Sequence, residues 1–301
     1  MFDNAKLHIY MNIIAATELI LTAEKKIYHL NLSKEEIADD ILLVGDPARV
    51  ELISNKFDTI DHKIENREFV THTGTINNKK ISAISTGIGT DNIDIVINEL
   101  DALVNINFDT RIVNSSKKSL NIIRLGTSGA LQENIPVDTL VVSSYGLGID
   151  NLAHFYADDK LIEKEMSKSY KKHTDWPKDL STPYIIKASN NLLTLFNDLN
   201  SGITATAPGF YGPQARKLRL NPSIEKLHQK MNSFNFKQHK ITNFEMETSA
   251  LYYLGQTLGH NTLTICAIIG NRLKKQYSKD YKKTIEGMID LVLKRISETK
   301  S

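Results

Sequence analysis

The sequence predicts a single α/β domain of three layers (α/β/α), built on a central mixed β-sheet. The first observation is that short apolar runs, typical of buried strands, alternate along the chain with segments whose apolar residues recur at helical spacing. The second is composition: 41% of the 301 residues are hydrophobic and 24% are charged, as in ordinary globular domains. Because the chain shows no repeat, low-complexity stretch or linker, we predict one domain over residues 1–301.

The first predicted strand covers residues 41–44, an unbroken run of Ile, Leu, Leu and Val. A helix is expected directly after it, with Asp46 as its N-cap. Residues 69–86 predict two strands, because two β-rich runs flank a tight turn at Asn77 and Asn78.

Helices and strands then alternate to the end of the chain. Residues 91–104 predict a helix with one apolar face, since their Ile, Val and Leu residues repeat at helical spacing. Further strands are predicted at 121–126, 139–144, 202–207, 243–247 and 262–270. Further helices are predicted at 185–197, 248–258 and 279–298.

Three segments are predicted to be additions to this domain. Residues 1–26 form an N-terminal extension, in which the apolar stretch is too short to span a membrane and lacks the features of a signal peptide. Residues 107–119 and 158–182 are the most polar stretches and are expected to be loops or surface insertions. Since Cys266 is the only cysteine, no internal disulfide can form, which favours a cytoplasmic protein.

The charge balance argues against two classes of partner. Lys and Arg number 37 against 35 for Asp and Glu, so the net charge is +2 and no segment is strongly basic. We therefore expect neither nucleic-acid binding nor membrane binding.

Two strand ends have the composition of an anion site. Gly45 follows the first strand and precedes a helix N-terminus, with Arg49 one turn further on; on this segment alone, an anion site and a plain turn fit equally well. Arg124 lies within an apolar strand, where an unpaired charge is costly, and residues 126–129 then supply amides and hydroxyls. Together they favour an oxyanion ligand, and phosphate best matches the arginine fork.

Two further segments suggest an organic ligand. Strand alternation places Glu245 and Glu247 on the same side, where they could accept hydrogen bonds from sugar hydroxyls, although capping of the next helix by Glu247 is the alternative. In the loop around residue 210, Phe210 could pack on a planar heterocycle whose edge is read by Gln214 and Arg216. Taken alone, this last segment is an ordinary loop.

Other motifs are better explained by structure than by chemistry. Gly87 and Gly89 lack the third glycine of a dinucleotide fingerprint, so we expect only a tight strand-to-helix turn. His62, His72 and His154 have no metal-ligand spacing, and no metal site is expected.

Taken in order, these elements resemble those of the nucleoside phosphorylase-I family, and most closely its uridine-cleaving members. The resemblance runs from residue 28 to residue 272. The matching motifs are YHLNLSKEEIADDILLVGDPARV, NREF, STGIGTDNIDIVINEL, IRLGTSGALQENIPV, FYGPQAR, NFEMETSALY and IIGNR. The resemblance implies phosphorolysis, in which a pyrimidine nucleoside such as uridine reacts with phosphate to give the free base and ribose 1-phosphate. It implies no cofactor, with inorganic phosphate as co-substrate.

The resemblance also implies roles for individual residues. The residues implied to bind phosphate are Gly45, Arg49, Arg124 and Thr127, with Arg67 from a neighbouring subunit. Those implied to bind ribose are Thr127, Met246 and Glu247, with His29 also donated across the interface. Those implied to bind the base are Phe210, Gln214, Arg216, Ile268, Ile269 and Arg272. Catalysis is expected to rest on Arg124, Glu247, Gln214 and Arg216, and a homodimer is the minimal active unit, with a higher oligomer left open.

Alternatives remain open at this point. A purine nucleoside phosphorylase of the same family is one, although purine-cleaving relatives typically carry an acidic residue where this chain has Gly270-Asn271-Arg272. A hydrolytic nucleosidase would have no need of a phosphate clamp. A non-catalytic nucleoside-binding relative would have no reason to keep the whole set of polar residues.

Overall fold

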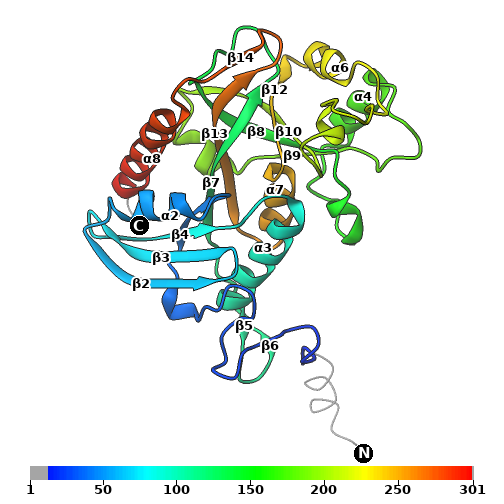
Figure 1. Ribbon diagram of the computed structural model, residues 1–301. Coiled ribbons are helices and arrows are strands. Elements are labelled where there is room, and N and C mark those ends of the chain that lie inside the picture. The colour runs from blue at the N-terminus through cyan, green and yellow to red at the C-terminus, as the bar shows by residue number, and fades with distance from the viewer. Residues whose placement is uncertain (1–12, 300–301) are drawn as a thin grey trace, which may run out of the picture.

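The computed structural model describes residues 13–299, and its centre is one mixed sheet of twelve strands (Figure 1). Ten of them follow the order β11-β12-β10-β8-β13-β7-β1-β4-β3-β2, while β14 pairs with β13 and β9 with β8. The strands of this sheet are β1 (Asp40–Val44), β2 (Thr59–Asn66), β3 (Phe69–Ile76), β4 (Lys79–Ser85), β7 (Asn121–Ala130), β8 (Leu140–Gly148), β9 (Tyr184–Lys187), β10 (Asn200–Thr206), β11 (Asn235–Phe236), β12 (His239–Glu245), β13 (Asn261–Asn271) and β14 (Gln276–Tyr277). A separate hairpin pairs β5 (Ile106–Asn107) with β6 (Ile112–Val113).

Helices lie on both sides of the strands β7 and β13, with α8 on one side and α3 and α7 on the other (Figure 1). The α-helices are α2 (Ala48–Ser54), α3 (Thr90–Asn105), α4 (Lys164–His173), α5 (Asn190–Thr194), α6 (Leu227–Ser233), α7 (Thr248–Thr257) and α8 (Tyr281–Glu298). Short 3₁₀ helices are η1 (Lys34–Glu36), η2 (Leu152–Phe155) and η3 (Gly212–Gln214). The predicted α/β fold with a central mixed sheet is confirmed.

The sheet also curls back on itself, which the sequence did not predict. The strands β1, β4, β7 and β13 run parallel to one another, but β12 pairs antiparallel with the far end of β7, at Asn243 with Ala130 and Phe244 with Gly129. This pairing closes a ring through β12, β10, β8, β13 and β7. The end of β12 is thereby brought beside the polar segment of β7 that begins at Arg124.

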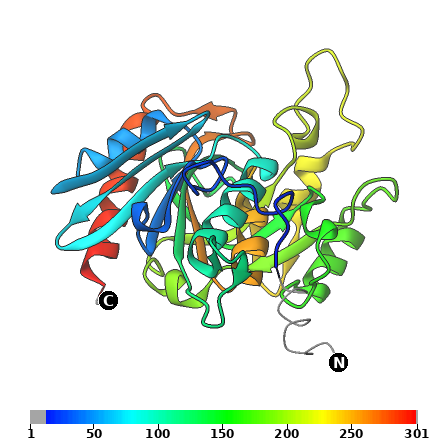
Figure 2. The same ribbon diagram turned by 90° about the horizontal axis from the view of Figure 1, so that it is seen from below.

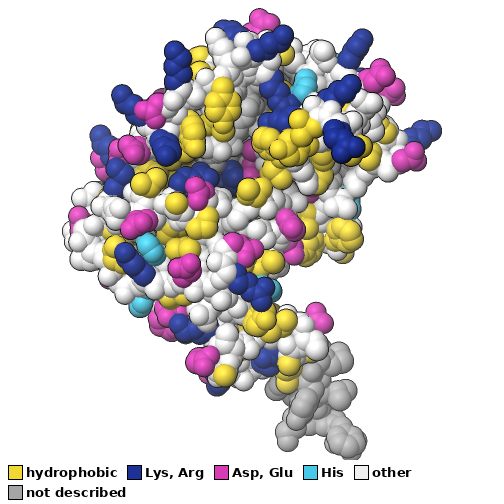
Figure 3. Space-filling model, viewed as in Figure 1, with side chains coloured by type: hydrophobic (Ala, Val, Ile, Leu, Met, Phe, Trp, Pro, Cys, Tyr) yellow, Lys and Arg dark blue, Asp and Glu magenta, His cyan; other side chains and the backbone are white. Residues whose placement is uncertain are grey.

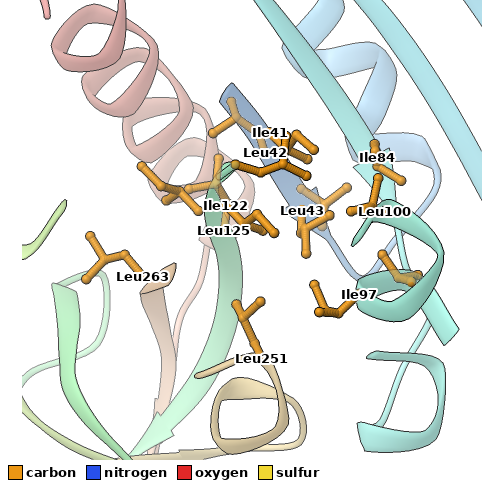
Figure 4. Close-up of a cluster of buried hydrophobic side chains, with 14 of the residues drawn as sticks. Ile41, Leu42, Leu43, Ile84, Ile97, Leu100, Ile122, Leu125, Leu251 and Leu263 are labelled. Atoms are coloured by element: carbon orange, nitrogen blue, oxygen red, sulfur yellow. The ribbon is translucent and has the colours of Figure 1, made fainter. Parts of the chain in front are cut away.

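The main core is built by the residues whose periodicity predicted the elements. On α3, Ile97 and Leu100 are fully buried, as the apolar stripe predicted. Figure 4 shows them facing Leu43 of β1, with Leu251 of α7 below. The turn between β3 and β4 also forms as predicted, because Asn77 and Asn78 adopt the left-handed conformation, with φ of 49° and 64°.

The segment 158–182 is not the loop that its polarity predicted. It contains the helix α4, whose Met166 and Tyr170 are buried in a second apolar cluster together with Trp176 and, from α6, Met231. Polar residues dominate the sequence here because the exposed face of α4 is rich in lysine. This cluster fixes α4 and α6 next to the ring of strands (Figure 1).

The helix predicted at 185–197 is wrong in its first half. Residues 184–187 form the strand β9, in which Tyr184, Ile185 and Ile186 are buried against β8, and the helix is limited to Asn190–Thr194. The alternative was available from composition, since β-branched and aromatic residues favour strands in short apolar runs.

The N-terminal extension and the segment 107–119 cover each other. The described part of the extension, which begins at residue 13, lies beside the β5–β6 hairpin labelled in Figure 1, and Figure 2 shows the same dark-blue segment from below. The Arg111 guanidinium donates to the carbonyl oxygens of Ile14 (2.8 Å) and Ala15 (3.0 Å), and the Ile14 amide donates to the Arg111 carbonyl (2.9 Å). Two segments that the sequence predicted separately are thus one structural unit.

Candidate active site

A cavity of about 970 Å³ opens where β1, β7 and β13 end, which is where ligands bind in open α/β sheets. Loops after β10 and β12 complete its wall. Eleven of the residues assigned to ligands from the sequence line it: Gly45, Arg49, Arg124, Thr127, Phe210, Gln214, Arg216, Met246, Glu247, Ile269 and Arg272. Segments separated by more than 200 residues therefore meet in one site.

Arg124 is the buried charge at the centre of the cavity, and only 4% of its surface is exposed. Its Nη2 donates to Glu247, and its Nη1 lies 3.4 Å from the Oε2 of Glu245. Burial disfavours its charge, but the carboxylates of Glu247 and Glu245 outweigh that cost and raise its pKa. Its Nε and Nη1 are buried and have no hydrogen-bond acceptor among residues 13–299, so the guanidinium is not fully paired within the described chain.

A second guanidinium faces Arg124 from α2. The Nη1 of Arg49 donates to the Leu125 carbonyl at 3.1 Å, and burial together with the charge of Arg124 lowers the pKa of Arg49. Two neighbouring cations in a half-enclosed site repel each other, and an anion bound between them would stabilise both. This pair of arginines is the feature that makes the site fit an oxyanion.

The first amides of α2 are not free for a ligand. The Asp46 side chain accepts from the Ala48 amide at 3.0 Å, and its carbonyl accepts from the Arg49 amide at 3.0 Å. The helix N-terminus is thus capped by its own residues. Gly45 still matters, because a Cβ there would lie 3.3 Å from the Gly87 carbonyl oxygen and press on the turn after β4 that also lines the cavity.

The two glutamates after β12 have different surroundings. Glu245 ends the strand, and its carboxylate accepts from the Thr206 hydroxyl (2.6 Å) and from the amides of Glu247 (2.9 Å) and Thr248 (3.0 Å). Burial raises the pKa of Glu245 to about 7, against the opposing charge of Arg124. The side chain that caps α7 is therefore that of Glu245, whose oxygens are used by its first amides, and not that of Glu247, for which capping was the alternative.

Glu247 has left the strand and occupies the N-cap position of α7. Strand alternation therefore gave the wrong reason for its orientation, although both carboxylates do meet Arg124. Its Oε1 accepts from the Gly89 amide at 2.9 Å, and its Oε2 accepts from Arg124. A carboxylate held in this way at the cavity wall presents fixed acceptors to a hydroxyl-bearing ligand.

The opposite end of the cavity is lined by two more arginines around an amide. The Arg216 guanidinium stacks on the Phe210 ring, 3.5 Å from its centroid, and its Nη1 donates to the Gln214 side-chain oxygen at 2.5 Å. Arg272 approaches the same oxygen at 3.3 Å. Burial and the charge of Arg216 lower the pKa of Arg272 to about 10. This end can therefore donate hydrogen bonds to a planar acceptor beside Phe210.

Ile268 does not shape the cavity, contrary to expectation. It is fully buried in a small separate cluster with Ala130, Ile135 and Val141. The register of β13 against β7 shifts between Ile268 and Gly270, and this irregularity leaves Ile269 on the cavity wall.

His29 and Arg67 do not line the cavity of their own chain. They lie next to each other, because Asn66 donates to the His29 carbonyl at 2.7 Å and Arg67 contacts the Tyr28 ring. The His29 ring is held by Glu99 through Nδ1 at 2.6 Å. Their role in a neighbouring subunit's site stays a prediction.

The turn between β4 and α3 was predicted to be structural only, and it also takes part in the site. Gly87 and Gly89 do make a tight turn, with φ of 72° and 103°. However, Gly87 and Ile88 also line the cavity, and Gly89 supplies the amide that holds Glu247. The one sequence signal at this turn was its place in the motif STGIGTDNIDIVINEL, which matches the family; no residue of the turn was predicted to belong to the site.

Two kinds of feature are absent from the described residues. Residues 13–299 contain no group of three or more His, Cys, Asp or Glu side chains that could hold a metal ion. No helix in the described part of the chain is long and apolar enough to cross a membrane. On the face shown in Figure 3, basic and acidic side chains are interspersed.

Comparison with known proteins gives the class to which this fold and site belong. The sequence model of the phosphorylase superfamily matches residues 39–297, and the chain belongs to that family. Among its relatives, the uridine phosphorylase of Thermococcus kodakarensis is 30% identical over 258 residues, which cover 86% of this chain and 82% of the relative. A DeoD-type purine nucleoside phosphorylase of Bacillus velezensis is 28% identical over 274 residues, covering 89% and 99%.

A solved structure also shares this fold. A Trypanosoma brucei nucleoside phosphorylase described as showing uridine phosphorylase activity superposes with a TM-score of 0.85. It is 26% identical, and the match covers 93% of this chain and all of that chain.

Proposed function

We propose that this protein catalyses the phosphorolysis of pyrimidine nucleosides, converting uridine and phosphate to uracil and ribose 1-phosphate. The observation that carries the proposal is the pair Arg49 and Arg124, whose guanidiniums face one cavity beside the carboxylate of Glu247. The uridine phosphorylases among its relatives support the same reaction. Phosphate is a co-substrate, no cofactor takes part, and the proposed setting is nucleoside salvage in the cytoplasm.

The proposed mechanism follows from where charge develops. Cleavage of the glycosidic bond leaves positive charge on the sugar and negative charge on the departing base. A phosphate held by Arg49, Arg124 and Thr127 stabilises the sugar cation and then attacks C1′, which makes the attack effectively intramolecular. Arg216 and Gln214 stabilise the anionic base through hydrogen bonds that strengthen during cleavage.

We favour a pyrimidine over a purine because of one segment at the base end. The resemblance implies an acidic residue there in purine-cleaving members, and this chain has Gly270-Asn271-Arg272 at the end of β13. The Asn271 amide is buried and donates to the carbonyls of Gln132 (3.0 Å) and Ile135 (2.9 Å), so it is used by the fold. The DeoD-type purine phosphorylases among the relatives keep the purine reaction as the second candidate.

The assay that tests the proposal measures base release from uridine, thymidine and inosine, each with and without phosphate. Uracil release that depends on phosphate supports the proposal. Phosphate-dependent release from inosine alone would leave the assignment of the phosphate site standing, but it would overturn the assignment of a pyrimidine as the base. Release that proceeds equally well without phosphate would identify a hydrolase and contradict the proposal.

Substitution of Gly126 tests whether the position of the Arg124 guanidinium determines phosphate binding. A Cβ at Gly126 would lie 2.0 Å from Nη1 of Arg124, so Gly126→Ala must displace the guanidinium. We expect the KM for phosphate to rise at least about tenfold, because one charge-assisted hydrogen bond is weakened. Gly287→Ala, at an exposed position on α8 outside the cavity, is the control, since a Cβ there would meet no heavy atom within 4 Å. Equal phosphate KM values for the two variants, measured by steady-state kinetics, would contradict this role of Gly126.

A homodimer is proposed as the minimal active unit, with His29 and Arg67 completing the neighbouring site. Arg67→Ala and Glu247→Gln are each expected to be nearly inactive as pure homodimers. A mixture of the two should regain activity, because some dimers then carry one site with both Arg67 and Glu247 intact. Absence of rescue after subunit exchange has been verified by native mass spectrometry would place Arg67 outside the active site.

A further inference from the structure

A histidine behind the base end of the cavity contacts two of the residues proposed to bind the base. His228 lies on α6 and does not line the cavity. Its Nε2 lies 2.8 Å from the Gln214 carbonyl oxygen and is hydrogen-bonded to Nη1 of Arg272. Arg272 in turn donates to the same carbonyl at 2.5 Å. The imidazole is therefore one contact away from the base site.

The core of the protein fixes the position of this imidazole. Leu227 and Met231, on the same helix, are buried in the second apolar cluster. Lys230 also ties α6 to α4, since its Nζ donates to the Thr174 carbonyl at 2.6 Å. His228 is thus presented from a packed helix, whereas Gln214 and Arg216 lie in the loop that follows β10.

All the acceptors that hold the two base-end arginines are neutral. Arg216 donates to the carbonyl of Phe210 and to the side chain of Gln214, each at 2.5 Å. Arg272 donates to Gln214 and to His228. Within residues 13–299, neither arginine forms an ion pair with a carboxylate, so their positive charge is not cancelled.

The histidine is suited to accept a proton from a cationic donor without carrying charge itself. Burial and the charge of Arg272 lower the pKa of His228 to about 4, so the ring is neutral at pH 7. Arg272 remains protonated there, with a pKa of about 10. If the neutral ring carries its proton on Nδ1, Nε2 and the Gln214 carbonyl oxygen both accept from Nη1 of Arg272, whereas a protonated ring would repel the guanidinium.

We propose that His228 is a positioning residue for the leaving base, because it holds Arg272, and through it Gln214, by a neutral hydrogen bond that leaves the arginine charge free for the departing anion. The inference rests on the proposed phosphorolysis of a nucleoside. It predicts that stabilisation of the leaving base needs a hydrogen-bond acceptor for Arg272 at position 228, and that this acceptor must be uncharged. A carboxylate would hold Arg272 equally well but would cancel the charge that stabilises the leaving base.

The test compares His228→Leu, His228→Gln and His228→Glu with the wild type, and uses Gln229→Leu, an exposed position on the same helix, as the control. Kinetics are measured with phosphate on whichever of uridine, thymidine or inosine the wild type cleaves fastest. A wild-type preference for inosine would overturn the proposed pyrimidine substrate and would leave the comparison of variants intact.

For His228→Leu we expect the KM for the nucleoside to rise and kcat/KM to fall by about tenfold to a hundredfold, the range for losing a hydrogen bond to a charged group. The KM for phosphate should not change, and His228→Gln should recover most of the loss. For His228→Glu we expect kcat to fall while the nucleoside KM stays close to the wild-type value. A His228→Gln variant as impaired as His228→Leu, or a fully active His228→Glu variant, would overturn the proposal. Thermal melting checks that each variant is folded.

Discussion

Replacing Arg124 by alanine is expected to lower kcat/KM for phosphorolysis by at least about a hundredfold. Arg124 would bind phosphate and also hold Glu247, and each hydrogen bond to a charged group is worth about 1.5–3 kcal/mol. Steady-state kinetics at limiting phosphate measure this loss directly. The same change should lower the free energy of unfolding by about 3–5 kcal/mol, because Glu245 and Glu247 lose their buried partner.

Two further variants separate catalysis from stability. Arg124→Lys keeps the charge and should recover most of the stability, but it should remain impaired because an ammonium cannot match the planar fork of arginine. Arg49→Met removes a guanidinium whose protein partner is the Leu125 carbonyl, so the fold should tolerate it while the KM for phosphate rises. A folded Arg49→Met variant with wild-type phosphate KM, together with a fully active Arg124→Lys variant, would contradict the assignment of the phosphate site.

Glu247→Gln is expected to lower kcat/KM for uridine by about a hundredfold, with a smaller loss for 2′-deoxyuridine. The carboxylate would accept hydrogen bonds from the ribose hydroxyls, and a neutral amide stabilises a developing sugar cation less well. Because 2′-deoxyuridine lacks the 2′-hydroxyl, it makes fewer hydrogen bonds that the substitution can weaken. The measurement is therefore the ratio of kcat/KM for the two nucleosides in the wild type and in the variant.

Glu245→Gln is the matched control for this prediction. Its carboxylate is buried beside Arg124 in the same way, but its oxygens are already used by Thr206 and by the first amides of α7. The substitution would place an amide NH₂ against backbone donors, so we expect a loss of stability with the ratio of uridine to 2′-deoxyuridine activity unchanged. A change of that ratio in the Glu245 variant, and none in the Glu247 variant, would mean that the ribose contact belongs to Glu245.

The parts of the fold that could be predicted from the sequence are those specified by local patterns. The apolar stripe of α3 and the Asn77-Asn78 turn follow from spacing and backbone preference within a few residues. The segment 158–182 could not be placed in this way, because the partners of Tyr170 and Trp176 lie on α6 and β10. Contacts so distant in sequence leave no local pattern.

The same distinction, between local patterns and contacts distant in sequence, explains which features of the site could be predicted. Arg124 was identified because a charged residue within an apolar strand needs a partner wherever the strand lies. The separate environments of Glu245 and Glu247 depend on where β12 ends and α7 begins, and helix and strand boundaries are the least predictable feature of a sequence. His228 had no motif to mark it, because its role depends on α6 packing behind Arg272.

The measurement that tests the central claim most directly follows labelled phosphate into the sugar. The enzyme is incubated with uridine and ³²P-labelled inorganic phosphate, and the label in sugar phosphate is counted against the uracil released. If Arg49 and Arg124 hold the attacking phosphate, one equivalent of labelled ribose 1-phosphate forms for each uracil. Release of uracil with free ribose and no labelled sugar would show that water is the nucleophile, and it would contradict the phosphorylase account.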